Sequence, residues 1–476
     1  MAFNNFLRTL PAGKKYLLHS YLNTVDAEMK RASVYIETFG CQMNVSDTER
    51  AVTSLRAAGY ALTADANTAD VILFNTCSVR ARAEQRVFNR IGEVRHQRRA
   101  AEPVVGIMGC VAQLEGELLF ESTPSLKIIA GTRATDRLPE LLKRALNGES
   151  RVIDLAERRE GEQWDISPVE RHSPHVAFVP IVEGCNKFCT YCIVPYSRGR
   201  ERSRTPAEII AEINKLIEAG YQEVHLIGQN VNSYRPKTIE GMASFQGATP
   251  FSRLLRAIAA TGMPRIKYTT SFPRDFHADI VAAMDENENL CNWVHLPVQS
   301  GSDKILRAMR RGYTAADYLK RVETIFSARR RYALTSDIII GFPSETAEDF
   351  ALTKTLVQRC QYDSLYIFKY SKRDGTPAAN LLDEINAEEK RERFLELEEL
   401  QKVIQRRILD SYIGKTVSVL VEGRSAKSTA DMTGHTTCNK VINFKAPGNL
   451  VGKLAPVHVT AAKTNSLYGE IIKCPA

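Results

Sequence analysis

Three cysteines on one short loop constrain this chain more than any other feature. Cys185, Cys189 and Cys192 have C-x3-C-x2-C spacing and follow the apolar run 177–182, so the loop is predicted at a strand end. Thiolates are the usual ligands of iron–sulfur clusters, and three of them on a [4Fe–4S] cluster leave one iron open for a small molecule. A zinc knuckle, which needs a fourth ligand, and three unrelated buried cysteines are the alternatives.

The sequence of this loop resembles that of one enzyme superfamily. With Tyr191 before its last cysteine, the loop resembles the radical S-adenosylmethionine (SAM) enzymes, and EGCNKFCTYCIVPYSRGRERSR resembles their methylthiotransferase branch. The resemblance implies a [4Fe–4S] cluster on Cys185, Cys189 and Cys192 whose open iron binds SAM. It also implies that the reduced cluster cleaves SAM to a 5′-deoxyadenosyl radical, with Tyr191 beside the cofactor.

A second set of cysteines is spread over residues 31–150. Apolar runs near 34–39, 71–75, 104–108 and 128–131 alternate with helical patterns, which predicts a doubly wound parallel α/β sheet. Ser46 and Glu49 predict a capping box that opens a helix ending at Gly59. Three of these strands are followed by a cysteine. Because the carboxyl ends of parallel strands share one edge of the sheet, where ligands bind, these cysteines should meet there. They are Cys41, Cys77 and Cys110. Taken singly, each is more often a small buried apolar residue.

The motifs around these three cysteines support a shared role. GCQMNVSDTE, NTCSVRARAE and MGCVAQ resemble the amino-terminal domain of methylthiotransferases. The resemblance implies an auxiliary [4Fe–4S] cluster on Cys41, Cys77 and Cys110 that carries the sulfur to be inserted. The Gln-Met-Asn and Ser-Val-Arg sequences after the first two cysteines are similar to those in the family of tRNA-2-methylthio-N6-dimethylallyladenosine synthases. Branches that act on threonylcarbamoyladenosine of tRNA or on an aspartate of a ribosomal protein are the alternatives.

After a predicted linker at 151–170, residues 171–409 repeat a strand–helix pattern. Six apolar runs predict a partial (β/α)6 barrel whose chemistry lies at the carboxyl ends of the strands. The runs are 177–182, 223–227, 266–270, 293–296, 333–340 and 364–370. Arg198, Arg200, Arg202 and Arg204 follow the cluster loop, and contact with RNA phosphates and support of the barrel mouth are equally weighted interpretations.

Several polar residues follow the predicted barrel strands and are candidates for binding SAM. Gln229 and Ser271 follow the second and third strands, and Gln299 follows the fourth. Gln229 stands where the radical SAM superfamily holds the amino group of SAM. The spacing of Gln299, Arg311 and Asp337 resembles coproporphyrinogen-oxidase-like radical SAM enzymes, which implies contact with the amino acid and ribose of SAM. Arginine pairs a carboxylate bidentately. Ordinary hydrogen bonds at the barrel rim are the alternative for Gln299 and Arg311.

The pattern changes to period two after Gly414. Short apolar runs at 416–423, 441–446, 457–463 and 468–472, separated by Gly, Pro and Asn, predict a small antiparallel β-barrel over residues 410–476. The segment resembles the TRAM domain, an RNA-binding module of tRNA-modifying enzymes. Small barrels also serve as inert caps, so the fold by itself assigns no function.

Composition sets the remaining limits. The chain has 476 residues, a net charge of +9 and ten cysteines. Cysteines clustered in motifs of a long chain favour metal ligands in a reducing cytoplasm over disulfides. No apolar run approaches the ~18 residues of a membrane span, so no membrane partner is expected. Residues 1–30 are predicted to be an amino-terminal extension without a signal-peptide pattern, and the protein is expected to be a monomer.

These features together predict a tRNA methylthiotransferase. The resemblance implies that it converts C2–H into C2–S–CH3 on N6-isopentenyladenosine next to the anticodon, with one SAM as methyl donor and one as radical source. The expected partners are the anticodon stem-loop of tRNA, a reductant and a donor of sulfur or clusters. The rival class is a non-catalytic iron–sulfur protein that binds RNA, for which Gln299, Arg311 and Asp337 have no evident use.

Overall fold

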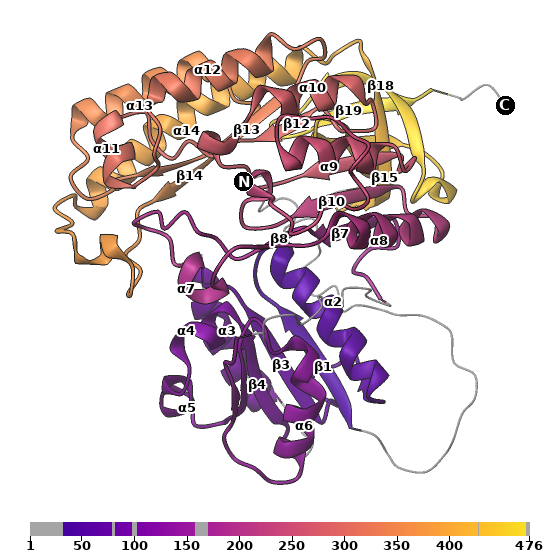
Figure 1. Cartoon of the computed structure of the whole chain (residues 1–476), viewed down its shortest axis with the longest axis vertical. Coiled ribbons are helices and arrows are strands. Elements are labelled where there is room, and N and C mark those ends of the chain that lie inside the picture. Colours follow the sequence, from indigo (N-terminus) through magenta and orange to yellow (C-terminus); the bar gives the residue numbers. More distant parts are fainter. Residues whose placement is uncertain (1–31, 79–80, 98–101, 158–169, 427, 473–476) are drawn as a thin grey trace. The chain divides into compact units, whose positions relative to one another are not determined.

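The computed structural model describes residues 32–78, 81–97, 102–157, 170–426 and 428–472. Within these residues the chain forms two compact units (Figure 1). The first unit contains the described residues up to His172 together with Ile193–Arg200, and the second contains Ser173–Cys192 and the described residues from Glu201 onward. The predicted extension at 1–30 and most of the predicted linker lie outside the described residues.

The first unit is built on one parallel sheet of six strands in the order β2-β1-β3-β4-β5-β6. Its strands are β1 (Ser33–Thr38), β2 (Ala61–Leu62), β3 (Val71–Thr76), β4 (Val104–Gly109), β5 (Leu126–Ala130) and β6 (Val152–Asp154). One apolar core joins the sheet to α3 (Ala81–Gln97), α4 (Cys110–Glu115) and α5 (Leu118–Ser122), and another joins it to α2 (Gln42–Ala57) and α6 (Leu138–Leu146). Helices therefore cover both faces, and the predicted doubly wound sheet is confirmed.

Two details of this unit differ from the sequence-based predictions. Helix α2 begins at Gln42 with Cys41 as its N-cap residue, so the predicted capping box at Ser46 and Glu49 is wrong. Both residues are buried within the helix. Asn44 takes the capping role instead, because its side-chain oxygen accepts from the Cys41 backbone N–H at 3.3 Å. Strand β6 falls within the range that was predicted as linker, and it pairs with β5.

The second unit begins with the barrel strands. Two parallel three-stranded sheets have the orders β11-β10-β7 and β12-β13-β14, and a bridge between Ile266 and Leu290 joins the β11 segment to the residues before β12. The strands are β7 (Val176–Pro180), β10 (Glu223–Ile227), β11 (Arg265–Tyr268), β12 (Trp293–His295), β13 (Ala333–Ile340) and β14 (Ser364–Lys369). The hairpin of β8 (Val182–Glu183) and β9 (Arg202–Ser203) follows β7.

Helices separate these strands as predicted. They are α8 (Pro206–Glu218), α9 (Pro250–Ala259), α10 (Ala278–Glu286), α11 (Asp303–Ala308), α12 (Ala315–Phe326) and α13 (Ala347–Cys360). Four of them, α8, α9, α12 and α13, start with a threonine N-cap in a capping box. Each cap fixes where the loop after a strand turns into a helix, and these loops carry the candidate site.

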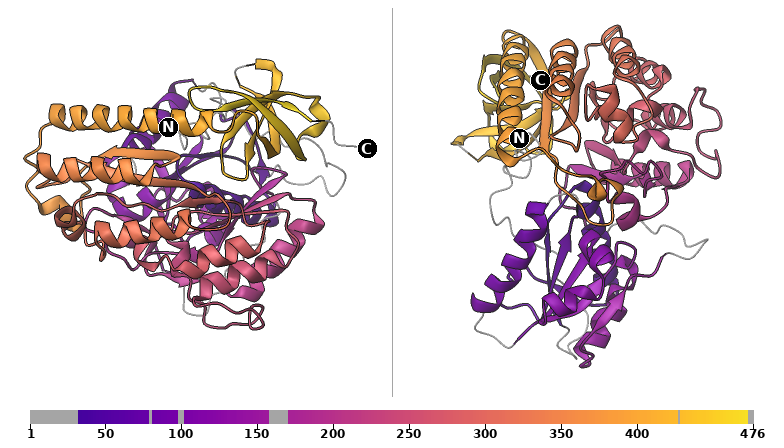
Figure 2. Two further views of the ribbon diagram at one scale, coloured as in Figure 1. Left: turned by 90° about the horizontal axis from the view of Figure 1, so that it is seen from above. Right: turned by 90° about the vertical axis from the view of Figure 1, so that its left-hand side faces the viewer.

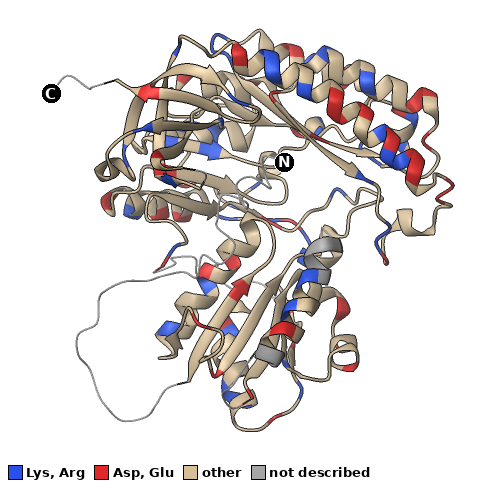
Figure 3. Ribbon diagram, turned by 180° about the vertical axis from the view of Figure 1, so that it is seen from behind, with Lys and Arg blue, Asp and Glu red and all other residues tan. Residues whose placement is uncertain are grey.

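The chain ends in a long helix and a small barrel. Helix α14 (Ala387–Asp410) carries both acidic and basic residues and leads into a closed barrel in the order β15-β16-β17-β19-β18 (Figures 2 and 3). Its strands are β15 (Thr416–Ser425), β16 (Ser428–Thr436), β17 (Val441–Lys445), β18 (Leu454–Ala462) and β19 (Leu467–Ile471). Because β17 and β19 are parallel, the barrel is mixed: the predicted antiparallel pairing holds for its other four strand pairs and fails at this one. Strand β16 was also not predicted, because its sequence is largely polar.

Buried charges attach this barrel to the amino-terminal ends of β10 and β11. The Arg265 guanidinium lies 2.8 Å from a Glu223 carboxylate oxygen and donates to the backbone carbonyls of His435 and Thr436 at 2.9 and 2.8 Å. Lys267 donates to the Asn439 side chain at 3.2 Å. The carboxyl-terminal barrel therefore lies at the end of β10 and β11 opposite to their carboxyl ends, which carry the candidate site. Among the described residues, no helix has the length and apolar character that crossing a membrane requires.

Candidate active site: two groups of three cysteines

The structure brings Cys41, Cys77 and Cys110 to the same edge of the first unit. They follow the carboxyl ends of β1, β3 and β4, which are neighbours in the sheet. A hydrogen bond links the thiols of Cys41 and Cys77, and Cys110 lies close enough to Cys41 to interact electrostatically. These three residues are called the auxiliary triad below.

Two asparagines and two glycines hold the loops of the auxiliary triad together. The Asn44 amide donates to Asn75 Oδ1 and to the Thr76 carbonyl, both at 3.0 Å. A Cβ on Gly40 would lie 2.9 Å from the Cβ of Cys77. Gly109 has φ +92°, and a Cβ at this position would collide with the backbone of Thr76. Side chains at these two positions would push the loops apart, so a glycine directly before Cys41 and before Cys110 is a packing requirement.

A buried ion pair lies against the auxiliary triad. Arg198, in the short helix α7 (Val194–Arg198), donates to Asp47 Oδ2 at 2.6 Å, and both side chains are at most 3% exposed. The hydrogen bond from Cys77 and the positive charge of Arg198 lower the pKa of the Cys41 thiol to about 6, although burial opposes this. Burial raises the pKa of Cys110, and the Arg198 charge offsets part of that effect.

This donor set fits an iron–sulfur cluster better than a single ion. Within the described part of the chain, no three His, Cys, Asp or Glu side chains are placed to hold one metal ion. A [4Fe–4S] cluster binds each thiolate on a different iron, so its cysteines do not have to meet at one point. A buried cation next to the thiols favours the thiolate form that iron requires.

The second group, Cys185, Cys189 and Cys192, lies on the loop after β8 and is called the SAM triad below. Gly184 begins this loop with φ +78°. The loop is held from two sides. Gln229 Oε1 accepts from the Gly184 backbone N–H at 2.6 Å, and Thr190 donates from its backbone and its hydroxyl to the carbonyls of Met309 and Ala308. The oxygen of Gln229 therefore supports the loop. Burial raises the pKa of Cys185 to about 11.

Arg311 is a charged residue in direct contact with the SAM triad. It is 4% exposed and donates to Cys189 Sγ at 3.4 Å, to the Tyr191 hydroxyl at 3.3 Å and to the Pro297 carbonyl at 2.7 Å. Its guanidinium also lies 4.3 Å from the centre of the Phe272 ring. The sequence-based prediction thus located a residue that touches both a cluster cysteine and the tyrosine beside it.

Three buried polar atoms at the carboxyl ends of β10, β11 and β12 have no hydrogen-bond partner among the described residues. They are Asn230 Oδ1, Ser271 Oγ and Gln299 Oε1. Gln299 has φ +76°, and its backbone pairs with β13, where it donates to the Asp337 carbonyl at 2.9 Å. Buried polar atoms normally have partners. Three such atoms at the same end of the barrel strands fit a polar ligand such as the amino acid part of SAM.

Other residues of the site escaped sequence reasoning. Lys187, inside the cluster loop, forms an ion pair with Asp275 and lies over the Phe272 ring. Of the arginines after the loop, Arg198 pairs with Asp47 and Arg204 pairs with Glu212. Both arginines are buried, so of the two equally weighted interpretations, contact with RNA phosphates does not apply to these two. Arginines that contact RNA and arginines that form buried ion pairs look alike in the sequence. Only the acidic partners that the fold brings to them distinguish the two.

Comparison with known proteins adds to this geometry. Residues 33–131 match uncharacterized protein family UPF0004, residues 179–357 match the radical SAM superfamily, and residues 410–472 match the TRAM domain. A tRNA-2-methylthio-N(6)-dimethylallyladenosine synthase of Solibacter usitatus is 48% identical over 441 residues, which cover 92% of this chain and 97% of that protein. Its counterpart in Geobacter sulfurreducens is 43% identical with the same coverage. The chain belongs to this synthase family.

As a member of the synthase family, the chain is a radical SAM enzyme whose cofactors are SAM and [4Fe–4S] clusters. The predicted family, fold class and cofactors are therefore confirmed. A solved structure of the radical SAM methyltransferase TsrM from Kitasatospora setae has a TM-score of 0.51 and 14% identity, and it covers 73% of this chain and 74% of that chain. At that identity the likeness concerns the fold alone.

Proposed function

We propose that this protein is a methylthiotransferase that converts C2–H into C2–S–CH3 on N6-isopentenyladenosine next to the anticodon of tRNA. The observation that carries the proposal is the pair of cysteine triads, one at the carboxyl ends of three parallel strands and the other on the loop after β8, each with one buried arginine against it. The full-length similarity to the synthase family supplies the substrate. An anticodon loop is single-stranded, so its bases can be splayed into a site without melting a helix.

Each triad has its own part in the proposal. Cys185, Cys189 and Cys192 would hold the cluster that binds SAM, and Cys41, Cys77 and Cys110 would hold the auxiliary cluster. When bound, these groups supply a 5′-deoxyadenosyl radical, which the unreactive aryl C–H bond calls for, and a sulfur that a second SAM methylates. Since a thiolate carries a negative charge, a buried guanidinium beside each triad lowers the cost of placing that charge in the interior.

The residues around the SAM triad bind and orient the cofactor in this proposal. Arg311 presents a buried cation to the carboxylate of SAM, and Tyr191 keeps that cation in place. Ser271, Gln299 and Asp337 supply acceptors and a donor for the ammonium and ribose. Gln229 acts indirectly, because its oxygen holds the cluster loop at Gly184.

The experiment uses reconstituted protein, SAM, a reductant and tRNA that carries isopentenyladenosine. Mass spectrometry of nucleosides and of 5′-deoxyadenosine measures both half-reactions. Cys185→Ala should abolish release of 5′-deoxyadenosine, whereas Cys77→Ala should keep that release and stop sulfur insertion. Methylthio product from either variant would contradict the assignment. A parallel incubation with ribosomal protein distinguishes the aspartate-modifying branch.

The remaining conditions follow from this chemistry. A one-electron reductant and a donor that rebuilds the auxiliary cluster are required partners. Free thiols as cluster ligands suit a reducing cytoplasm, where we place the protein. A monomer is sufficient, because one chain carries both triads.

A further inference from the structure

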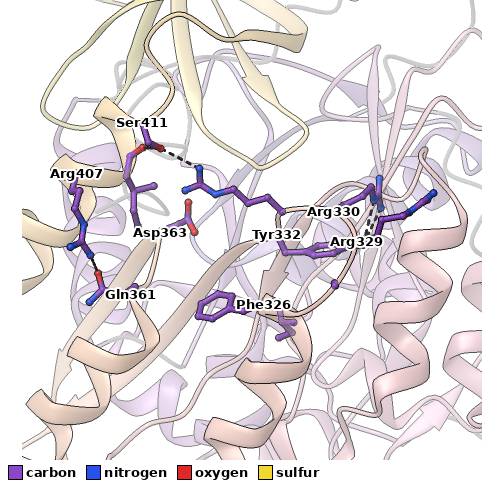
Figure 4. A pocket seen from close by; sticks show the side chains of 12 residues that line it. Phe326, Arg329, Arg330, Tyr332, Gln361, Asp363, Arg407 and Ser411 are labelled. Atoms are coloured by element: carbon purple, nitrogen blue, oxygen red, sulfur yellow. Dashed lines mark hydrogen bonds between the residues drawn. The ribbon is translucent and has the colours of Figure 1, made fainter.

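A basic pocket lies in the second unit, at the amino-terminal ends of β13 and β14. Its volume is about 520 Å³, and it is lined by the end of α12, by residues 328–332, by the loop before β14 and by the end of α14. Figure 4 shows Asp363, Arg407 and Ser411 on one side of the pocket and Arg329, Arg330 and Tyr332 on the other, with the ring of Phe326 between them. The candidate active site does not use these residues.

The pocket contains more positive charge than its own carboxylates neutralise. Four arginines line it against one acid, Asp363, which is already paired with Lys440. Arg330 serves the fold, since it donates to the Leu290 carbonyl at 2.8 Å and faces Asp285 at 3.8 Å. The other three form no ion pair with an acidic side chain in the described part of the chain. They are Arg329, Arg331 and Arg407, and each is exposed.

The positive surface continues onto the start of the carboxyl-terminal barrel. Arg331 donates to the Ser411 hydroxyl at 3.1 Å, and its guanidinium lies 5.2 Å from the centre of the Tyr412 ring. Lys415, which is exposed, lies 5.6 Å from the same ring. Like charges held this close repel one another, so the arrangement has a cost that an anionic ligand would remove.

An aromatic ring completes the lining. The side chain of Phe326 is 49% exposed beside the arginines. Guanidinium groups with an accessible aromatic face are a combination that binds single or looped nucleic acid, because phosphates meet the charges and bases or sugars pack on the ring. A pocket for a small apolar ligand would not need three unpaired cations.

The pocket is far from the reacting end of the barrel. Strand β13 has eight residues between Ala333, next to the pocket, and Ile340 at the carboxyl end. At about 3.3 Å per residue, the strand places the pocket roughly 25 Å from the residues that would hold SAM. Contacts made here cannot involve the target base, and they must involve backbone elsewhere in the same RNA.

We propose that this pocket binds the sugar–phosphate backbone of tRNA outside the anticodon loop. The inference rests on the proposed function for its substrate and adds the surface that holds it. The contacts are to phosphates, so they give affinity and salt dependence without reading sequence. The pocket thereby extends RNA binding from the carboxyl-terminal barrel onto the barrel domain that carries SAM.

The test measures tRNA affinity of the reconstituted enzyme over a range of KCl concentrations. The triple variant Arg329→Gln/Arg331→Gln/Arg407→Gln is compared with Arg359→Gln/Arg391→Gln/Lys402→Gln. The control removes the same net charge from exposed sites of the same unit that already face Glu323, Glu388 and Glu398. Each lost phosphate contact should lower the slope of log K against log salt by about 0.7–0.9.

We expect the pocket variant to lose about two units of this slope and to bind tRNA at least roughly tenfold more weakly at low salt. The control should match the wild type. KM for tRNA should rise, while turnover at saturating tRNA is kept. Replacing the same three arginines with lysine keeps the charge and should restore the slope, which separates charge loss from misfolding. An unchanged slope in the pocket variant, with wild-type enzyme that binds and modifies tRNA, overturns this inference alone. Failure of the wild type to bind tRNA would instead refute the proposed function.

Discussion

At the scale of single residues, the two buried arginines are fixed in different ways. Arg198 is held by a carboxylate, Asp47, whose negative charge offsets part of the effect of the guanidinium on the auxiliary triad. Arg311 donates to a carbonyl, two hydroxyls and a thiol, and no acidic side chain in the described residues forms an ion pair with it. A positive charge therefore remains at the SAM triad, where an incoming carboxylate can use it.

The Arg198–Asp47 pair should show strong coupling. Arg198→Gln alone leaves a buried carboxylate without its cation, and Asp47→Asn alone leaves a buried cation, so each should lower the free energy of unfolding by about 3–5 kcal/mol. The double variant should lose much less than the sum. Urea unfolding of the cluster-free protein, analysed as a double-mutant cycle, measures the coupling. Additive losses would mean that the two side chains act independently.

His225 should make stability depend on pH. Burial lowers its pKa below the ordinary value, against the opposing effect of Glu223. Because the unfolded chain then binds a proton that the folded chain rejects, stability is complete above the unfolded pKa of about 6.5 and falls as the pH drops below it. One such proton contributes at most ~1.4 kcal/mol per pH unit.

The measurement for His225 is the free energy of unfolding of the cluster-free protein between pH 7.5 and about 5.5, the upper part of the window set by the histidine pKa. His225→Gln should flatten the slope relative to the wild type. His277→Gln, at an exposed residue that caps α10, is the control of the same residue type. Equal slopes in all three proteins would contradict the assignment.

At the scale of elements, the Glu223–Arg265 pair should hold the carboxyl-terminal barrel to the second unit. Arg265→Ala removes an ion pair and two hydrogen bonds to backbone carbonyls of β16, and it leaves Lys267 and His225 with Glu223. We expect a loss of about 3 kcal/mol, the lower end for a broken buried pair. The loss should appear as a lower melting temperature and faster tryptic cleavage near residue 415. Arg265→Met with Glu223→Gln should recover part of the stability, and unchanged cleavage in Arg265→Ala would refute the role.

Elements with strong local signals were predictable from the sequence. Strand β3 begins with four consecutive apolar residues, and all six of its residues are buried, which is the pattern of a strand covered on both faces in an α/β chain. The cysteines were predictable because each follows a strand end. Strand β16 was missed because polar residues alternate with Met432 and Gly434, and its place depends on pairing with β15 and β17. Non-local pairing leaves no periodic signal.

The start of α2 shows why the site itself was only partly predictable. Ser46 and Glu49 have the residue types and spacing of a capping box. The helix nevertheless begins earlier, because Asn44 caps it and also donates hydrogen bonds to Asn75 and Thr76 on β3. The side chain that starts the helix is thus selected by contacts about 30 residues away in sequence. The ion pairs of Arg198 and Lys187 were missed for the same reason, since their acids, Asp47 and Asp275, are remote in the chain.

At the scale of the whole molecule, each compact unit has its own apolar core and its own triad. The first unit holds Cys41, Cys77 and Cys110 above two cores on the faces of its sheet. The second holds Cys185, Cys189 and Cys192 on a core that the barrel strands share with β15–β19. Cys41 donates to Asn44 within the first unit, and Cys189 accepts from Arg311 within the second. Each site therefore has the means to form without the other.

Independent loading is the consequence that can be measured. Fully reconstituted wild-type protein should hold about eight irons per chain, as two [4Fe–4S] clusters require. Replacing the three cysteines of either triad with alanine should leave about four, with the spectrum of the remaining cluster unchanged. Addition of SAM should alter the electron paramagnetic resonance spectrum of the reduced cluster only in the variant that keeps Cys185, Cys189 and Cys192. If removing one triad emptied both sites, the clusters would depend on each other, and the assignment of one site to each unit would fail. Retention of about eight irons in either variant would show that other residues bind iron.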